Sequence, residues 1–276
     1  MLAALIIVFR EVIEAGLIVG IVLAATRGVP TRGRWVTYGV GAGVLGALLL
    51  AFFAGAISDA FEGTGQELLN AGVLSLAVVM LTWHNVWMAR HGREIAQEMR
   101  AVGSAVSTGE RPLTALAVVV GLAVLREGSE VVLFLYGVLA GGNSAGAVFA
   151  GGLAGLAAGV VFTLLTYAGL LTVPSRYIFQ VTSVLIALLA AGLAAQAVQF
   201  LDAAGVITTL QTTLWDTSAW LSESSLFGKL LHTLIGYTER PSEMQLVVYV
   251  TVLAVMAVLM WALKPPAKQP ALASQS

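Results

Sequence analysis

Long apolar stretches separated by short polar segments dominate the sequence. A helix needs about 20 mostly apolar residues to cross the hydrocarbon core of a bilayer. Seven stretches come close to or exceed that length, and each predicts a membrane-spanning helix: 2–26, 35–57, 68–89, 113–140, 146–171, 178–201 and 245–263. The pattern therefore predicts an all-α, polytopic membrane protein that forms one domain over residues 1–276.

Composition supports this class and excludes others. Only 11% of the 276 residues are charged, whereas soluble domains carry about a quarter. A net charge of −1 argues against a basic nucleic-acid-binding protein. The chain has no cysteine, which excludes disulfides, thiol catalysis and thiolate metal sites.

Basic residues between the stretches predict their orientation, because Lys and Arg gather in cytoplasmic loops. Ten of them fall on one side if the N-terminus lies outside and the C-terminus in the cytoplasm: Arg27, Arg32, Arg34, Arg90, Arg93, Arg100, Arg111, Arg176, Lys264 and Lys268. The other side has two bases against eight acids, a net charge of −6. We therefore expect a multi-pass protein of the cytoplasmic (inner) membrane whose outer face attracts cations.

Two motifs place charges inside apolar stretches. They are Arg10-Glu11-Val12-Ile13-Glu14 and Arg126-Glu127-Gly128-Ser129-Glu130. A signal peptide has no charges within its apolar segment, so the first stretch is expected to be a helix of the mature protein. At about 100° per residue, the charged side chains of each motif share one arc of about 100°. That face is expected to point into the protein, because a charge at the bilayer centre costs roughly 2.5–3.5 kcal/mol.

Each motif holds more acid than base. Each arginine can pair with the acid four residues later, which leaves Glu11 and Glu127 uncompensated. An ion-pair clamp between helices would balance its charges, so the repeated excess favours a site for protons or for a hard di- or trivalent cation. Iron, manganese, calcium and magnesium all fit carboxylate ligands, and the residues alone do not choose among them.

The motifs lie 116 residues apart, and the same offset aligns Gly39-Val40-Gly41-Ala42-Gly43-Val44 with Gly155-Leu156-Ala157-Ala158-Gly159-Val160. Residues 1–90 and 112–206 therefore look like duplicated three-helix units, and an odd number of spans gives the copies opposite topology. Inverted repeats place transport sites near the midplane, where the copies meet. The outer loop 207–244, the seventh helix 245–263 and the cytoplasmic tail 264–276 are expected to be additions.

A doubled Arg-Glu-x-x-Glu motif on seven stretches with an outside N-terminus resembles the high-affinity iron permease family. Its members include fungal permeases that work with a multicopper oxidase and bacterial permeases that work with periplasmic partners. The last outer loop adds to the resemblance through Trp215-Asp216-Thr217-Ser218, Leu231-His232-Thr233-Leu234-Ile235-Gly236-Tyr237 and Arg240-Pro241-Ser242. Both motifs depart from the commonest family wording, Arg-Glu-Gly-Leu-Glu, but they keep its charged positions.

The resemblance implies that the motif glutamates bind iron during transport: Glu11, Glu14, Glu127 and Glu130. It implies that Arg10 and Arg126 orient these acids and balance their charge. Iron is then the transported substrate, and no resident cofactor is expected. An oxidase or a periplasmic iron-binding protein is expected as a separate chain.

Weaker candidates lie elsewhere. Auxiliary roles are assigned to Asp59, Glu62, Glu67 and His84. The three acids crowd the first outer loop, for which an ordinary solvated loop is the alternative. His84 is either a polar station on the route to the cytoplasm or a hydrogen-bonded helix contact. Residues 203–244 predict short amphipathic helices on the membrane surface, where His232 and Glu239 are the first residues to test.

The sequence thus predicts an iron permease that imports iron across the cytoplasmic membrane. We expect no enzyme activity, because no HExxH motif is present and no His–Asp pair suggests an activated nucleophile. Two alternatives stay open: a transporter of another divalent metal such as manganese or lead, and a proton-conducting or structural membrane subunit.

Overall fold

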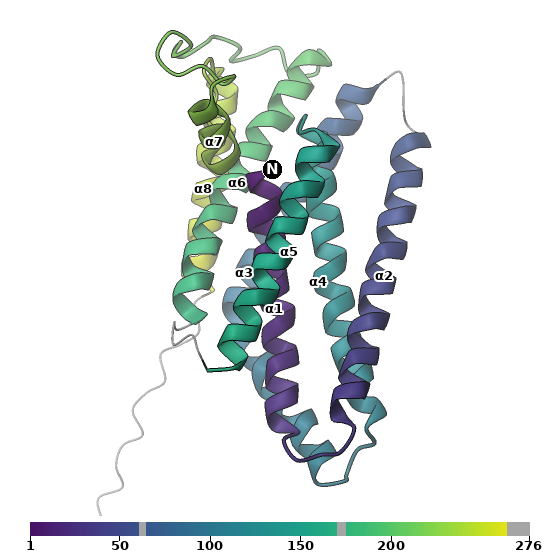
Figure 1. Ribbon diagram of the computed structural model, residues 1–276. Coiled ribbons are helices and arrows are strands. Elements are labelled where there is room, and N and C mark those ends of the chain that lie inside the picture. Colours follow the sequence, from purple (N-terminus) through teal and green to yellow (C-terminus); the bar gives the residue numbers. More distant parts are fainter. Residues whose placement is uncertain (61–64, 170–174, 264–276) are drawn as a thin grey trace, which may run out of the picture.

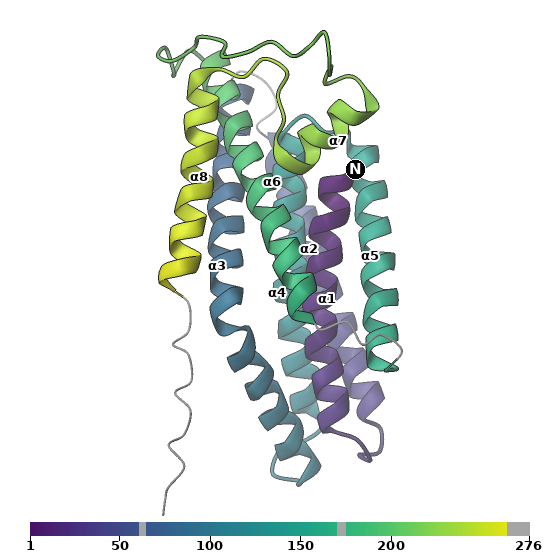
Figure 2. The ribbon, with the colours of Figure 1, turned by 90° about the vertical axis from the view of Figure 1, so that its left-hand side faces the viewer.

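A computed structural model describes residues 1–60, 65–169 and 175–263 as helices joined by turns and loops. Some side chains within its helices, including those of 55–60, lie outside the described part. The helices, in chain order, are α1 (Leu2–Ala25), α2 (Arg32–Ala60), α3 (Gln66–Ser107), α4 (Thr114–Ala140), α5 (Ala145–Tyr167), α6 (Ser175–Ala203), α7 (Leu226–Ile235) and α8 (Glu243–Ala262). The long helices stand side by side in one bundle, and α7 lies at the end where α1 begins (Figures 1 and 2).

The described helices agree with the expected spans to within a few residues, except for the third. Within the described residues, five segments are long and apolar enough to cross a membrane: Arg32–Ala54, Gln66–Gly92, Ala145–Tyr167, Phe179–Ala203 and Glu243–Ala262. Helices α1 and α4 match the other expected spans and carry the charged motifs at their centres. The chain is therefore a multi-pass membrane protein.

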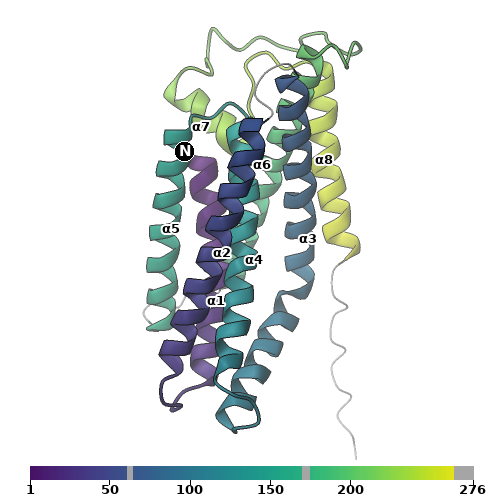
Figure 3. The ribbon, with the colours of Figure 1, turned by 90° about the vertical axis from the view of Figure 1, so that its right-hand side faces the viewer.

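Helix α3 extends well beyond the predicted span 68–89. It continues to Ser107, through a segment that the sequence suggested was a polar loop. Polarity misled the prediction, because this segment has good helix formers and no proline to interrupt the helix. The helix ends just before Gly109, whose φ of 79° breaks the α-helical conformation. Figure 3 shows this extension of α3 slanting across to the lower ends of the neighbouring helices.

Two buried apolar clusters lie along α1 and α4, one on each side of the charged motifs. The larger contains Ile7 of α1 and Phe134 of α4, together with residues of α3, α6 and α8. The smaller contains Val22 of α1 and Val120 of α4. Because Ile7 precedes and Val22 follows the first motif, and Val120 precedes and Phe134 follows the second, the charges occupy a polar layer between apolar ones.

Glycines bring two helix pairs into backbone contact. A Cβ atom added at Gly43 of α2 would lie 2.7 Å from the carbonyl oxygen of Gly121 in α4. A Cβ atom at Gly155 of α5 would lie 2.5 Å from the carbonyl oxygen of Leu5 in α1. Small residues permit such close approach between membrane helices. The second helix of each expected unit therefore packs on the first helix of the other unit.

The register of these contacts differs from the ungapped alignment. Gly39 lies against Ala117, whereas Gly151 lies against Met1, the residue 116 positions before Ala117. In its contacts the counterpart of Gly39 is therefore Gly151 and not Gly155, a difference of one helical turn. The connection before α5, at 141–144, is shorter than the one before α2, at 26–31, and this contributes to the displacement.

We predict that Gly43→Ala lowers the stability of the purified protein by about 1–3 kcal/mol, because its Cβ atom has no space against α4. The matched control is Gly41→Ala, on the same helix, where no atom lies within 4 Å of the added Cβ. This control should be neutral or gain up to about 1 kcal/mol from helix propensity. Thermal unfolding in detergent measures both, and equal melting temperatures would contradict the packing described.

Candidate metal site

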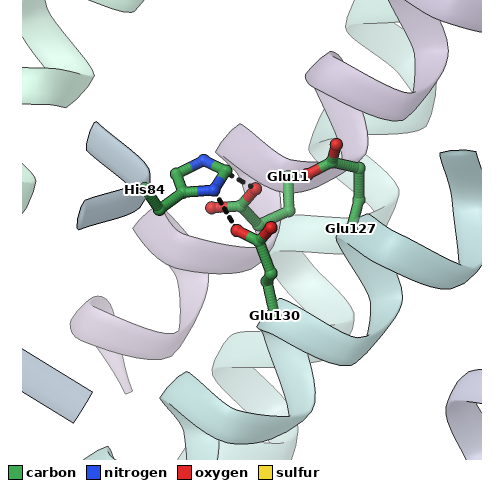
Figure 4. Close-up of side chains that lie close together, drawn as sticks. All are labelled: Glu11, His84, Glu127 and Glu130. Atoms are coloured by element: carbon green, nitrogen blue, oxygen red, sulfur yellow. Dashed lines mark ion pairs between the residues drawn. The ribbon is translucent and has the colours of Figure 1, made fainter. Parts of the chain in front are cut away.

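The two charged motifs meet at the centre of the bundle. Helices α1 and α4 are in contact and turn their charged faces toward each other and toward α3. Figure 4 shows Glu11 of α1, Glu127 and Glu130 of α4 and His84 of α3 converging on one place. The prediction that these faces point into the protein is confirmed for Glu11, Glu14 and Glu127, which are all at most 3% exposed.

On α1, Arg10 binds both acids of its own motif. Its Nε atom lies 2.9 Å from Glu14 Oε1, and its NH1 atom lies 3.7 Å from Glu11 Oε1. All three side chains are buried. A buried charge that loses its partner typically costs 3–5 kcal/mol or so, so this group is stable only as a unit.

On α4, Arg126 is held differently. Its Nε atom lies 3.2 Å from Glu130 Oε1, and its guanidinium carbon lies 4.1 Å from the ring centroid of Trp87 on α3. This position combines an ion pair with a cation–π contact. The Arg126 side chain is 37% exposed, against 2% for Arg10. Each motif thus contains an i,i+4 ion pair, but the arginine of the second motif is partly exposed at the protein surface and that of the first is not.

His84 lies between the two motifs. Its Nε2 atom is 3.5 Å from Glu14 Oε2 and 3.6 Å from Glu11 Oε2, and its Nδ1 atom contacts Glu130 Oε2. The ring also meets Phe134 edge-on, with centroids 6.2 Å apart. The side chain is 3% exposed, so the carboxylates of both motifs surround a single buried imidazole.

Four side chains can offer ligand atoms to one cation. Glu11, His84, Glu127 and Glu130 each place one such atom within 4.8 Å of the others. Both oxygens of Glu11 and one oxygen of Glu127 are buried without a hydrogen-bond partner in the described part of the chain. Buried carboxylate oxygens require a donor or a cation, and this donor set suits a divalent metal ion.

The arrangement differs from the predicted four-glutamate set at one position. Glu14 lies outside the cluster of mutually close ligand atoms and instead accepts the ion pair from Arg10. His84, considered only an auxiliary candidate from the sequence, lies inside the cluster. Its only sequence signal is that His84 and Asn85 are polar residues within an apolar stretch, and that signal does not reveal which helix face meets the motifs.

The predicted acids of the first outer loop do not extend this site in the described part of the chain. Glu67 is exposed in the first turn of α3 and is not a member of the cluster. Glu62 and the side chain of Asp59 lie outside the described residues.

The outer segment contains one helix, α7, where short amphipathic helices were expected. It packs on α6, where a Cβ atom added at Gly192 would lie 2.7 Å from Gly236 Cα. His232 of α7 has both ring nitrogens engaged, with Nδ1 2.7 Å from the Tyr237 carbonyl oxygen and Nε2 2.7 Å from Gln196 Nε2. These two contacts of His232 hold α7 against α6 and against the segment that follows α7.

Acids of the outer segment also maintain its own structure. Glu223 and Glu239 each accept a hydrogen bond, 2.9 Å long, from the backbone N–H of the other. Asp216 accepts hydrogen bonds from the hydroxyl and the backbone N–H of Ser218 and lies 3.0 Å from Arg240 Nε. These contacts lower the pKa of Asp216 to about 2. The Asp216, Ser218 and Arg240 positions of the sequence resemblance thus form one contact.

Comparison with known proteins identifies the family of the chain. A model of the iron permease FTR1 family matches residues 1–266. The chain belongs to this family. The relatives that it matches include proteins named ferrous iron permease EfeU from Shigella sonnei (strain Ss046) and Escherichia coli O157:H7, each 36% identical over 273 residues that cover 97% of both chains.

Another relative is named putative inactive ferrous iron permease EfeU, from Escherichia coli (strain K12), and is 35% identical over 274 residues that cover 97% of both chains. No solved structure matches this chain. Since these relatives are named permeases, the chain groups with transporters, as its sequence predicted.

We predict that Arg10→Gln destabilises the protein more than Arg126→Gln. The first change leaves two buried carboxylates without their cationic partner and should lower the free energy of unfolding by about 3–5 kcal/mol. The second removes a 37% exposed guanidinium, whose pairing is partly screened by its surroundings, and should cost less. Chemical unfolding of the two purified variants in detergent gives the comparison, and a larger loss for Arg126→Gln would contradict the assigned environments.

Proposed function

We propose that this chain imports ferrous iron across the cytoplasmic membrane through a site formed by its two Arg-Glu-x-x-Glu motifs. The observation that carries the proposal is the convergence of Glu11, Glu127 and Glu130 on one buried point between α1 and α4. Intramembrane acids at a helix interface are expensive and typically mark ion pathways. The iron is substrate, and the proposal needs no resident cofactor.

Charge supports a divalent ion. When ionised, the four motif glutamates carry −4 and the two motif arginines +2, so the group retains −2. A divalent cation neutralises this remainder, whereas a trivalent cation leaves an excess positive charge in an apolar interior. The relatives' printed names specify ferrous iron.

We infer seven spans arranged as an inverted 3+3 repeat plus α8. Three observations support the repeat: the α2·α4 and α1·α5 pairs are exchanged between the halves, both pairs meet through glycines, and the motif helices α1 and α4 contact each other. In this arrangement α8 is the added span, and residues 1–90 and 112–206 form the two units. The distribution of basic residues supports an N-terminus outside and a C-terminus in the cytoplasm.

The proposed route of the ion follows from the order of apolar and polar layers along the bundle. The apolar cluster around Ile7 and Phe134 would separate the site from outside, and the cluster around Val22 and Val120 would separate it from the cytoplasm. An inverted repeat can open these barriers in turn by rocking one half against the other. The net charge of −6 on the outer side favours import by concentrating cations there.

A separate oxidase or periplasmic iron-binding protein would deliver the iron. The acids that the outer segment uses in its own hydrogen bonds are poor candidates for receiving it, because Glu223, Glu239 and Asp216 are already engaged. A transporter of another divalent metal such as manganese fits the same ligands, and metal preference separates the two. A proton-conducting or structural subunit would not move metal by itself.

We predict that Glu127→Gln and Glu130→Gln each lower the initial rate of Fe²⁺ uptake into proteoliposomes by about tenfold or more, the range reached when even an outer partner of a metal ligand is lost. The control with the same change of charge is Glu98→Gln, an exposed residue on the extension of α3. It should transport at the wild-type rate.

Uptake of Mn²⁺ and other divalent ions in the same vesicles tests the substrate. Faster transport of Mn²⁺ than of Fe²⁺ would overturn the iron assignment, and undiminished Fe²⁺ uptake in both glutamate variants would overturn the site. Wild-type protein that moves no metal would favour a structural or proton-conducting role.

A further inference from the structure

His84 differs from the other two histidines of the chain in how its ring is held. Nδ1 of His91 lies 3.1 Å from the Trp87 carbonyl oxygen, and Nδ1 of His232 lies 2.7 Å from the Tyr237 carbonyl oxygen. A backbone carbonyl thus anchors each of those rings. In His84 both nitrogens instead face carboxylates: Nδ1 contacts Glu130, and Nε2 lies near Glu11 and Glu14.

The position of the His84 ring between carboxylates is suited to a metal ligand. A metal-binding histidine offers one nitrogen to the ion while its second nitrogen is oriented by a carboxylate or a carbonyl group. His84 has carboxylates of α4 and of α1 on its two sides, so either nitrogen can bind the ion while an acid orients the other. One of its nitrogens already lies within 4.8 Å of the ligand atoms of Glu11, Glu127 and Glu130.

We propose that His84 is a nitrogen ligand of the transported ion and gives the site its preference for transition metals over Ca²⁺ and Mg²⁺. This inference rests on the proposed function and deepens it. Carboxylates alone suit Ca²⁺ and Mg²⁺, which take oxygen ligands, as well as they suit iron. An imidazole donor suits iron, nickel, copper and zinc. The mixed donor set therefore supplies a discrimination that the two motifs cannot.

The source of the nitrogen breaks the symmetry of the proposed repeat. Carboxylates come from α1 and α4, which correspond to each other, but the imidazole comes from α3 alone. Its counterpart α6 supplies no member of the cluster in the described part of the chain. The pairing of Glu14 with Arg10 fits this assignment, because His84 provides the fourth donor that a strictly symmetric site would take from Glu14.

The direct test is electron spin-echo spectroscopy of the full-length protein loaded with Mn²⁺, a paramagnetic divalent probe. We expect nitrogen coupling to Mn²⁺ in the wild type, with frequencies that change when the three histidines are labelled with ¹⁵N. The labelled wild type needs no substitution, so the result does not depend on whether a variant folds. Bound Mn²⁺ without nitrogen coupling would overturn the proposal.

The variant His84→Gln replaces the nitrogen donor by an amide oxygen. We expect it to lose the nitrogen coupling to Mn²⁺. We also expect it to bind Fe²⁺, measured without oxygen, about tenfold or more weakly while Ca²⁺ binding persists, so that the ratio of the Fe²⁺ and Ca²⁺ affinities falls. His91→Gln, on the same helix, is the control and should retain both the coupling and the ratio. Coupling that persists in His84→Gln, or an unchanged affinity ratio, would contradict the assignment.

These measurements separate the two proposals. Iron uptake that depends on Glu127 and Glu130, together with Mn²⁺ that shows no nitrogen coupling, refutes only the role of His84. Wild-type protein that binds neither Mn²⁺ nor Fe²⁺ refutes the proposed function as well.

Discussion

Burial of charged side chains at the centre of an apolar bundle is the constraint on which the remaining structure depends. Each such charge costs roughly 2.5–3.5 kcal/mol at the middle of a membrane helix, and α1 and α4 carry three apiece. The cost is offset within each motif by the Arg10–Glu14 and Arg126–Glu130 pairs, and between motifs by contact through His84. The motif helices must therefore stay together, and the excess of acid that remains is what a divalent cation would neutralise.

The rest of the bundle serves this central layer. Glycines let α2 lie directly on α4 and α5 directly on α1, so the motif helices are supported from behind while their charged faces meet. Apolar clusters then close the layer along the helix axes, with Phe134 on one side and Val120 on the other. A transported ion has to pass both clusters, so the proposed mechanism requires each barrier to open separately. Exposure is already unequal at the site, since Arg126 is far more accessible than Arg10.

Much of this arrangement can be predicted from the sequence, because charged side chains within membrane helices must face the protein interior and pair with one another. The positions of the helices, the inward direction of Glu11 and Glu127 and the ion pair of each motif could all be predicted from spacing and hydrophobicity. Three features could not. The extension of α3 has the polarity of a loop, and the one-turn displacement of Gly151 depends on the length of a connection. The position of His84 among the motif carboxylates depends on the rotation of α3 about its axis. Each is set by packing between helices, which periodicity along one helix does not specify.

The central claim is that one divalent ion binds between the two halves of the protein. Anomalous diffraction from crystals grown with Mn²⁺ tests it most directly, because the signal locates the metal without reference to transport. The account predicts a strong anomalous peak between α1 and α4, within bonding distance of carboxylates from both Glu11 and Glu127. Peaks confined to the outer segment, around Glu223, Glu239 or Asp216, with none between the two motifs, would contradict it.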